Sequence, residues 1–262
     1  MARRKFADHR LPPLGNFGLT IIVFGLSIIE MKPAAVRFEL DSMIADIELT
    51  LVSIIQGVAL AVLIDNARQV VAKFEFTAWP YVIAGLLVIL VFWSRAVLHI
   101  ITVIRWPLEF GHNFLYIACA LVEAISFSQL ARPARWFAFG AAFIAAGWVL
   151  FAYDLRLIRA RMDDSTGEAS RRLYALVARD QWFNLGLLLP AIFLINVACA
   201  MSIQRWPQFF VSRNGHIWLV VMQLGAFAGY LLYVMKFYMR LAPFIAQARA
   251  EWRDSADPAD LA

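Results

Sequence analysis

The chain has 262 residues, of which 62% are hydrophobic and 16% are charged, and its mean hydropathy is +0.68. Water-soluble domains are about 45–50% apolar and about 25% charged, so a soluble globule could not bury this much apolar surface, and the excess must face lipid. The two cysteines both lie in apolar runs and exclude a disulfide scaffold or a cysteine-based zinc site. The net charge of +5 is typical of the cytoplasmic loops of membrane proteins. We therefore expect membrane lipid, and no nucleic acid, as a partner.

Six segments of the chain are long enough to cross a membrane, because a helix needs about 20 apolar residues to span a hydrocarbon core about 30 Å thick. Trp79, Trp136 and Trp206 lie at or near the ends of these segments, where an indole ring prefers the lipid headgroups. The sequence therefore predicts an all-α, polytopic bundle of transmembrane helices. The predicted spans are residues 43–64, 79–104, 113–131, 136–158, 181–203 and 216–241.

A seventh apolar stretch, residues 17–29, is too short to cross unaided and would form an interfacial helix, a short span or a signal anchor. With six spans, Lys and Arg divide 17 to 6 between the two sides, and with seven spans they divide 13 to 10. Because basic residues gather on the cytoplasmic side, we predict six spans in the inner cell membrane with both termini cytoplasmic. Seven spans with an outside N-terminus is the alternative.

The chain reads as a single membrane domain, because no linker rich in Gly, Ser or Pro divides it. The bundle would occupy residues 43–241, between cytoplasmic tails at 1–42 and 242–262. The one long polar connector, residues 155–180, predicts a helical hairpin with a capping box over residues 165–168. This hairpin would either contact water and lipid headgroups or dock a protein partner.

One motif occurs twice, as Arg-Trp-Pro followed by Gly-His within residues 105–112 and again within residues 205–216. Each copy follows the second span of a three-span unit, so the two copies would lie on opposite faces of the membrane, as in the 3+3 inverted repeats of many transporters. The alternative is that Arg, Trp and Pro each favour a span end for separate reasons and that the motif arose twice.

Ionisable side chains inside the spans are the strongest functional signal, because each costs several kcal/mol in lipid unless it meets a partner or water. The second span carries Arg95 and His99 on one helical face, and the third span carries Glu123. Arg95 lies fourteen residues before Glu109, in the predicted turn, and Glu123 lies fourteen residues after it. An antiparallel hairpin would place both charges at the same depth, so we predict that Arg95 and Glu123 form an ion pair.

On the first span, Asp46 shares one helical face with Thr50, Ser53 and Gly57, with Glu48 beside it. We expect polar groups of four spans to line a vestibule that opens to the cytoplasm and favours cations or protons. The alternative is that these groups only tie helices together or reach the headgroups. The predicted pathway or gate residues are Arg95, Glu123, His99, Asp46, Glu48, Asp154, Asn184 and Asn196.

Two backbone features are expected in the last two spans. Gly225 and Gly229 form a Gly-x-x-x-Gly pattern, which favours close helix packing within the chain or between chains. Pro190 is expected to kink the fifth span.

No nucleotide-binding loop, nucleophile elbow, zinc-protease motif or dinucleotide fingerprint occurs in the sequence. The four histidines are scattered along the chain, so we predict no metal site, no cofactor and no enzymatic activity. The expected function is a channel or transporter for a cation or a proton-coupled small solute. The alternative is a non-transporting subunit, sensor or assembly factor that binds a protein partner, and either protein could form a homo-oligomer or join a membrane complex.

Overall fold

The computed structural model describes residues 33–73, 76–104 and 109–254, and over these residues it contains helices and no strands. Within these residues, six helical segments are long and apolar enough to span a membrane, which confirms the predicted all-α bundle of transmembrane helices. The stretch 17–29 lies outside the described residues. The elements are α1 (Pro33–Ala72), η1 (Phe76–Ala78), α2 (Trp79–Thr102), α3 (Phe110–Phe127), α4 (Pro133–Asp163), α5 (Glu168–Phe183), η2 (Asn184–Leu188), α6 (Leu189–Arg205), η3 (Gln208–Ser212) and α7 (His216–Asp254).

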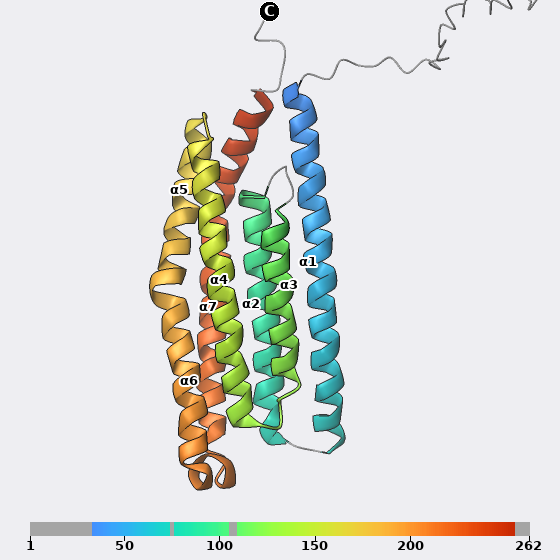
Figure 1. Cartoon of the computed structure of the whole chain (residues 1–262), viewed down its shortest axis with the longest axis vertical. Coiled ribbons are helices and arrows are strands. Elements are labelled where there is room, and N and C mark those ends of the chain that lie inside the picture. Colours follow the sequence, from blue (N-terminus) through green and yellow to red (C-terminus); the bar gives the residue numbers. More distant parts are fainter. Residues whose placement is uncertain (1–32, 74–75, 105–108, 255–262) are drawn as a thin grey trace, which may run out of the picture. The chain divides into compact units, whose positions relative to one another are not determined.

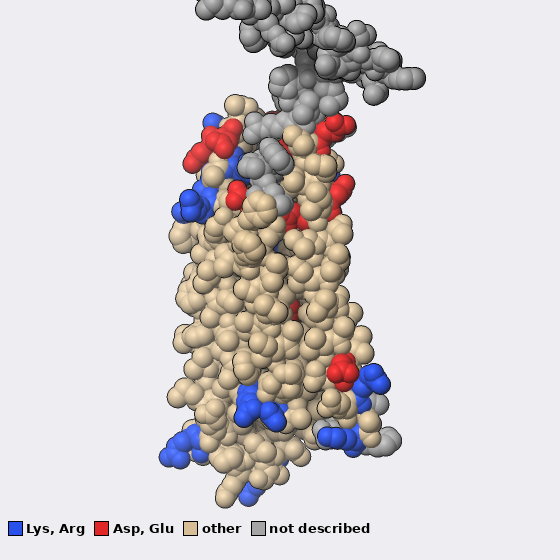
Figure 2. All heavy atoms as spheres, turned by 45° about the vertical axis from the view of Figure 1, so that its right-hand side comes forward, with Lys and Arg blue, Asp and Glu red and all other residues tan. Residues whose placement is uncertain are grey.

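The six span-length segments lie side by side and alternate in direction, with α5 and α6 forming one continuous run (Figure 1). The beginning of α1, the α4–α5 turn and the end of α7 lie at one end of the bundle, which we call the upper end. The α1–α2, α3–α4 and α6–α7 connections lie at the lower end. On the face drawn in Figure 2, acidic and basic side chains gather towards the two ends, and the band between them is almost entirely free of charge. This distribution is the one that a lipid bilayer requires.

The packing contacts between the helices form a closed ring, and the order of the helices around this ring differs from their order in the chain. Helix α1 packs against α2 and α3, α3 packs against α4, and α4 packs against α5 and α6, while α7 packs against α5 and α2. Helices α2 and α3 are not a main packed pair among the described helices, but their side chains meet in the interior, where Phe92 stacks on Tyr116 with ring centroids 4.7 Å apart. The two three-span units also pack differently, since α1 contacts α3 whereas α4 and α7 are not a main pair. Helix packing therefore gives the inverted repeat no support.

The first span faces the opposite way from the prediction. Glu48 and Gln56 are buried, with 0% and 4% of their surface exposed, whereas Asp46 and the residues that share its face are exposed. Glu48 and Gln56 each hydrogen-bond a polar side chain on α3. Because positions 46 and 48 are about 200° apart around a helix, only one of the two faces can point inward, and the face with polar partners does so.

The hairpin at 155–180 forms, but its cap is not the predicted one. The Ser165 hydroxyl donates to the Arg161 carbonyl, and α5 has no side-chain cap from its own N-cap residue, Gly167. Instead the Glu251 carboxylate, on α7, accepts hydrogen bonds from the Ala169 backbone N–H at 2.8 Å and the Ser170 backbone N–H at 3.1 Å. A carboxylate suits this position because the first N–H groups of a helix have no partner within it.

The fifth span is one helical run from Glu168 to Arg205. Its regular α-helix is interrupted by the π-helical η2 just before Pro190, which lies in the first turn of α6. Proline has no N–H to donate to the preceding turn, which explains an irregularity at this place. Gly225 and Gly229 are exposed, and a Cβ at either position would meet no atom within 4 Å. They therefore do not mediate close packing within the chain, and association between chains stays a prediction.

Candidate functional site

Two buried polar clusters lie inside the upper half of the bundle. The arginine cluster consists of Arg95 on α2, Asp180 and Gln181 on α5, Asn184 in η2, and Tyr230 and Tyr233 on α7. The histidine cluster consists of His99 on α2, His112 on α3 and Asp154 on α4. Because Arg95 and His99 are one turn apart on α2, the two clusters are neighbours.

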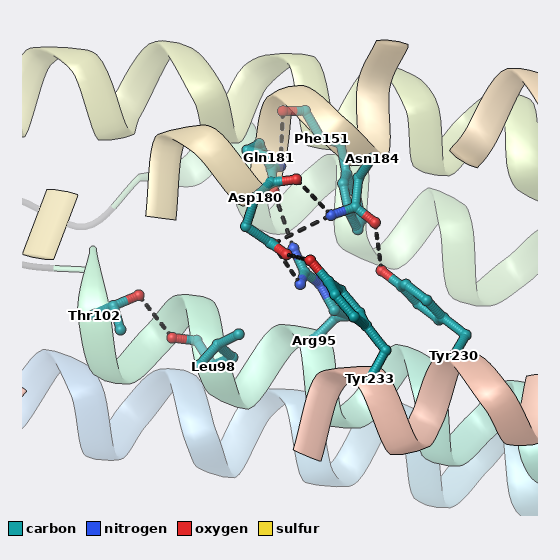
Figure 3. Close-up of polar contacts among 9 residues, drawn as sticks. All are labelled: Arg95, Leu98, Thr102, Phe151, Asp180, Gln181, Asn184, Tyr230 and Tyr233. Carbon is teal, nitrogen blue, oxygen red and sulfur yellow. Dashed lines mark hydrogen bonds and ion pairs between the residues drawn. The ribbon is translucent and has the colours of Figure 1, made fainter. Parts of the chain in front are cut away.

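Arg95 is held by α5 (Figure 3). One terminal nitrogen lies 2.7 Å from Asp180 Oδ2, and the other donates to Gln181 Oε1 at 3.1 Å. The guanidinium also lies 5.2 Å from the centre of the Phe151 ring. Only 9% of the Arg95 side chain and 1% of the Asp180 side chain are exposed, so this is a buried ion pair with additional polar contacts.

The remaining polar groups of the arginine cluster also find partners. The Tyr233 hydroxyl donates to Asp180 Oδ1 at 2.6 Å, and the Tyr230 hydroxyl donates to Asn184 Oδ1 at 2.6 Å. The Asn184 amide donates to the Asp180 carbonyl and carboxylate, and the Gln181 amide donates to the Phe151 carbonyl at 2.9 Å. The cluster thereby joins α2, α4, α5 and α7. A network with every member satisfied rigidifies the helices that it joins.

The predicted ion pair between Arg95 and Glu123 is wrong, since Arg95 pairs with Asp180. Helix α2 ends seven residues after Arg95, whereas Glu123 lies thirteen residues after the start of α3. The difference of six residues places Glu123 about 9 Å deeper, at ~1.5 Å rise per residue. Glu123 instead accepts a hydrogen bond from Gln56 Nε2 at 3.3 Å.

The histidine cluster brings together three helices around one carboxylate. His112 Nδ1 lies 2.8 Å from Asp154 Oδ1, and His99 Nε2 lies 3.5 Å from the same oxygen. The two imidazole rings stack with centroids 4.9 Å apart. All three side chains are buried, and His99 Nε2 has no hydrogen-bond partner within the described part of the chain. Three potential ligand atoms therefore surround one point inside the bundle.

Local features of α3 place this cluster. His99 lies in the last turn of α2 and His112 in the first turn of α3, so both histidines fall near the same level. Gly111 allows α3 to approach α4 closely, because a Cβ there would lie only 2.7 Å from the Tyr153 hydroxyl oxygen. The next residue, Asn113, donates to Glu48 Oε1 at 2.8 Å, which connects the cluster to α1.

Seven of the eight predicted pathway residues are buried, but they do not form one group. His99 and Asp154 meet in the histidine cluster, Glu48 lies beside it, and Arg95 and Asn184 belong to the arginine cluster. Glu123 and Asn196 lie deeper in the bundle, where Asn196 Oδ1 accepts a hydrogen bond from Gln223 at 3.1 Å. Asp46 is exposed and joins neither cluster. The two clusters also contain five residues that were not predicted as site residues: His112, Asp180, Gln181, Tyr230 and Tyr233.

Three small cavities follow successive stretches of α4. The first cavity, of about 20 Å³, is lined by the histidine cluster, by Phe151, and by Arg95, Asp180 and Gln181 of the arginine cluster. The second, of about 60 Å³, is apolar apart from Arg95 and Tyr230 and includes Gly147 in its lining. The third, of about 20 Å³, is lined by Glu123, Asn196 and Gln223 as well as apolar groups. Neighbouring cavities share lining residues: Phe92, Arg95 and Phe151 between the first and second, and Val88, Phe143, Ile144 and Phe227 between the second and third.

Comparison with known proteins does not indicate a function for the two clusters and the cavities. No family model matches the chain, and no curated protein or solved structure shows significant similarity to it. The site itself is therefore the basis for a functional proposal.

Proposed function

We propose that the chain is a membrane channel or transporter for a cation or a proton-coupled small solute. The observation that carries this proposal is the row of three cavities along α4, which begins and ends at buried ionisable groups. The stretch of α4 from Trp136 to Asp154 is about 27 Å long at ~1.5 Å per residue. This length is close to the hydrocarbon thickness of about 30 Å.

Polar linings in the two end cavities and a largely apolar lining in the middle one are the arrangement expected of a closed pathway. Its first cavity offers Asp154 and two histidines, and its third offers Glu123, whereas the second cavity is largely apolar. An apolar constriction between polar sites blocks ions until it widens or fills with water. Carboxylates at both ends favour a cation or a proton over an anion. Arg95, at the boundary between the first and second cavities, would be a gate residue.

The test is flux in proteoliposomes with a variant that fills the second cavity. Gly147 is buried and lines this cavity, and a Cβ there would meet no atom within 4 Å. Gly147→Val should therefore lower cation or proton flux strongly while the chain still folds. Gly225→Val is the matched control, because Gly225 has equally open surroundings but is exposed, and its flux should equal that of the wild type.

Two results would contradict the proposal. One is wild-type flux of protons, Na⁺, K⁺ and divalent cations that equals the leak of protein-free liposomes. The other is unchanged flux in Gly147→Val. Either result would favour a non-transporting subunit, sensor or assembly factor that binds a protein partner.

We also propose that the upper end faces the cytoplasm of a cell with an inner membrane. The arginines of the 155–180 hairpin and most basic residues of α7 belong to this end, and basic residues mark the cytoplasmic side. A reporter that is active only in the cytoplasm should be active when fused to the C-terminus, and a reporter that is active only after export should be inactive there. Activity of the exported reporter instead would show that the upper end faces away from the cytoplasm.

A further inference from the structure

We propose that His99, His112 and Asp154 bind one divalent transition-metal ion, for which zinc matches the donor set. Two imidazoles and one carboxylate form a common set of protein ligands for catalytic zinc and for non-haem iron. The three residues come from three different helices, and each is buried. Binding at this site does not require that the chain transports anything, so the inference stands apart from the proposed function.

The distances suit a metal ion after small side-chain rotations. One potential ligand atom from each residue lies within 4.8 Å of the others. Ligands at about 2.0–2.2 Å from zinc in a tetrahedral site are about 3.3–3.6 Å apart. Asp154 Oδ1 already meets this spacing from His99 Nε2, at 3.5 Å. Rotation of the His112 ring about its side-chain bonds is the main change that closes the site.

An unpartnered nitrogen points to a missing ligand. His99 Nε2 is buried and has no hydrogen-bond partner in the described part of the chain, although buried polar atoms are nearly always paired. Asp154 Oδ1, the carboxylate oxygen 3.5 Å from this nitrogen, is already 2.8 Å from His112 Nδ1. A metal ion would occupy the unused lone pair of His99 and also bind Asp154.

The local charge favours a divalent cation. Within the described residues, the charge of Arg95 is matched by Asp180, and neither Asp154 in the histidine cluster nor Glu48 beside it forms an ion pair with a Lys or Arg. Glu48 is fully buried, and its Oε2 atom has no hydrogen-bond partner among the described residues. Two buried carboxylates with neutral histidines are balanced by one ion of charge +2.

The first cavity provides space beside the three ligands. It is lined by His99, His112 and Asp154 and has a volume of about 20 Å³, enough for one water molecule. Three protein ligands with room for a water as the fourth are typical of an open zinc site rather than a closed structural one.

The experiment measures metal binding by the purified full-length chain in detergent after removal of bound metal with a chelator. Zinc is added, free ion is removed, and metal per chain is measured by mass spectrometry. We expect one zinc ion per wild-type chain, and cobalt(II) in its place should give visible absorption bands characteristic of four- or five-coordinate nitrogen and oxygen ligation. His99→Gln and Asp154→Asn should each weaken zinc binding at least about 100-fold, since loss of outer partners alone costs about 10–100-fold.

The matched control is His216→Gln. His216 is also a buried histidine, but its Nδ1 lies 2.9 Å from the Tyr81 hydroxyl, away from the histidine cluster. This variant should bind one zinc ion with wild-type affinity. Wild-type chain that binds no zinc or cobalt overturns the proposal without reference to any variant. Equal loss in His216→Gln and His99→Gln, with both variants eluting as the wild type does in gel filtration, would also overturn it.

Discussion

The arginine cluster and the histidine cluster are adjacent, yet they differ in how fully their polar atoms are paired. In the arginine cluster, both oxygens of Asp180 accept hydrogen bonds, from Arg95, Asn184 and Tyr233. In the histidine cluster, two histidines converge on a single oxygen of Asp154, and His99 Nε2 has no hydrogen bond within the described residues. A fully paired cluster is suited to holding helices together. A cluster with unused capacity is suited to binding something else.

The largest effect is expected when the paired cluster is broken. Asp180→Leu leaves the Arg95 guanidinium buried without its counter-charge, and loss of one partner of a buried pair costs about 3–5 kcal/mol in the free energy of unfolding. The measurement is denaturant unfolding of the purified chain in mixed micelles.

The double variant Arg95→Leu with Asp180→Leu separates a true pair from two independent contributions. Removing both charges leaves no unpaired charge of this pair in the interior, so the double variant should be more stable than Asp180→Leu alone. If the stability loss of the double variant equals the sum of the losses of Arg95→Leu and Asp180→Leu measured singly, the paired-cluster interpretation is incorrect.

The sequence predicts the burial of polar groups more accurately than it predicts their partners. The rule that lipid excludes unpaired charge selects Arg95, Glu123 and Asp154 correctly, because burial depends mainly on position within an apolar span. Partner choice depends on which helices pack together. Because α2 packs against α7 and reaches α5, while α2 and α3 are not a main pair, the partner of Arg95 comes from a segment that reads as a polar connector.

Asp180 and His112 could have been found by two signals in the sequence. Helix α5 buries Leu173, Val177 and Asp180, at spacings of four and three residues, so helical periodicity would have placed Asp180 on the inner face. His99 and His112 flank the same predicted turn, and an antiparallel arrangement places them near one level. No local spacing in the sequence predicts that Asp154 contacts both histidines, since this contact depends on the packing of α3 against α4.

An intermediate effect is expected at Glu251, which pairs polar groups at the rim rather than in the interior. Its carboxylate accepts hydrogen bonds from the backbone N–H groups of Ala169 and Ser170 and from the Ser170 hydroxyl. Glu251→Ala should lower the free energy of unfolding by about 1 kcal/mol, the usual contribution of a helix N-cap. Amide hydrogen exchange should rise first at the start of α5.

The control for Glu251 is Glu168→Ala, at the start of the same helix. Glu168 pairs with Arg172, but the two side chains are 79% and 65% exposed. Exposed pairs contribute between zero and about 1 kcal/mol, so this change should leave exchange at Ala169 and Ser170 nearly unaltered. Equal effects of the two variants would show that Glu251 acts through general charge and not as a cap.

The smallest effect, and one of opposite sign, is expected at His99. His99→Leu removes Nε2, a buried nitrogen with no hydrogen bond to any described residue, and puts an apolar side chain of similar size in its place. Replacing an unpaired polar atom by an apolar group is nearly neutral or stabilising, so in the presence of chelator the free energy of unfolding should stay level or rise by up to about 1 kcal/mol. The contact between His112 and Asp154 does not involve His99 and should persist. A loss of more than about 2 kcal/mol under these conditions would mean that the nitrogen is paired in the metal-free chain, and the contrast between the two clusters would then disappear. Added zinc should stabilise the wild type but not this variant, because an ion that binds only the folded chain raises the free energy of unfolding as its free concentration exceeds its dissociation constant.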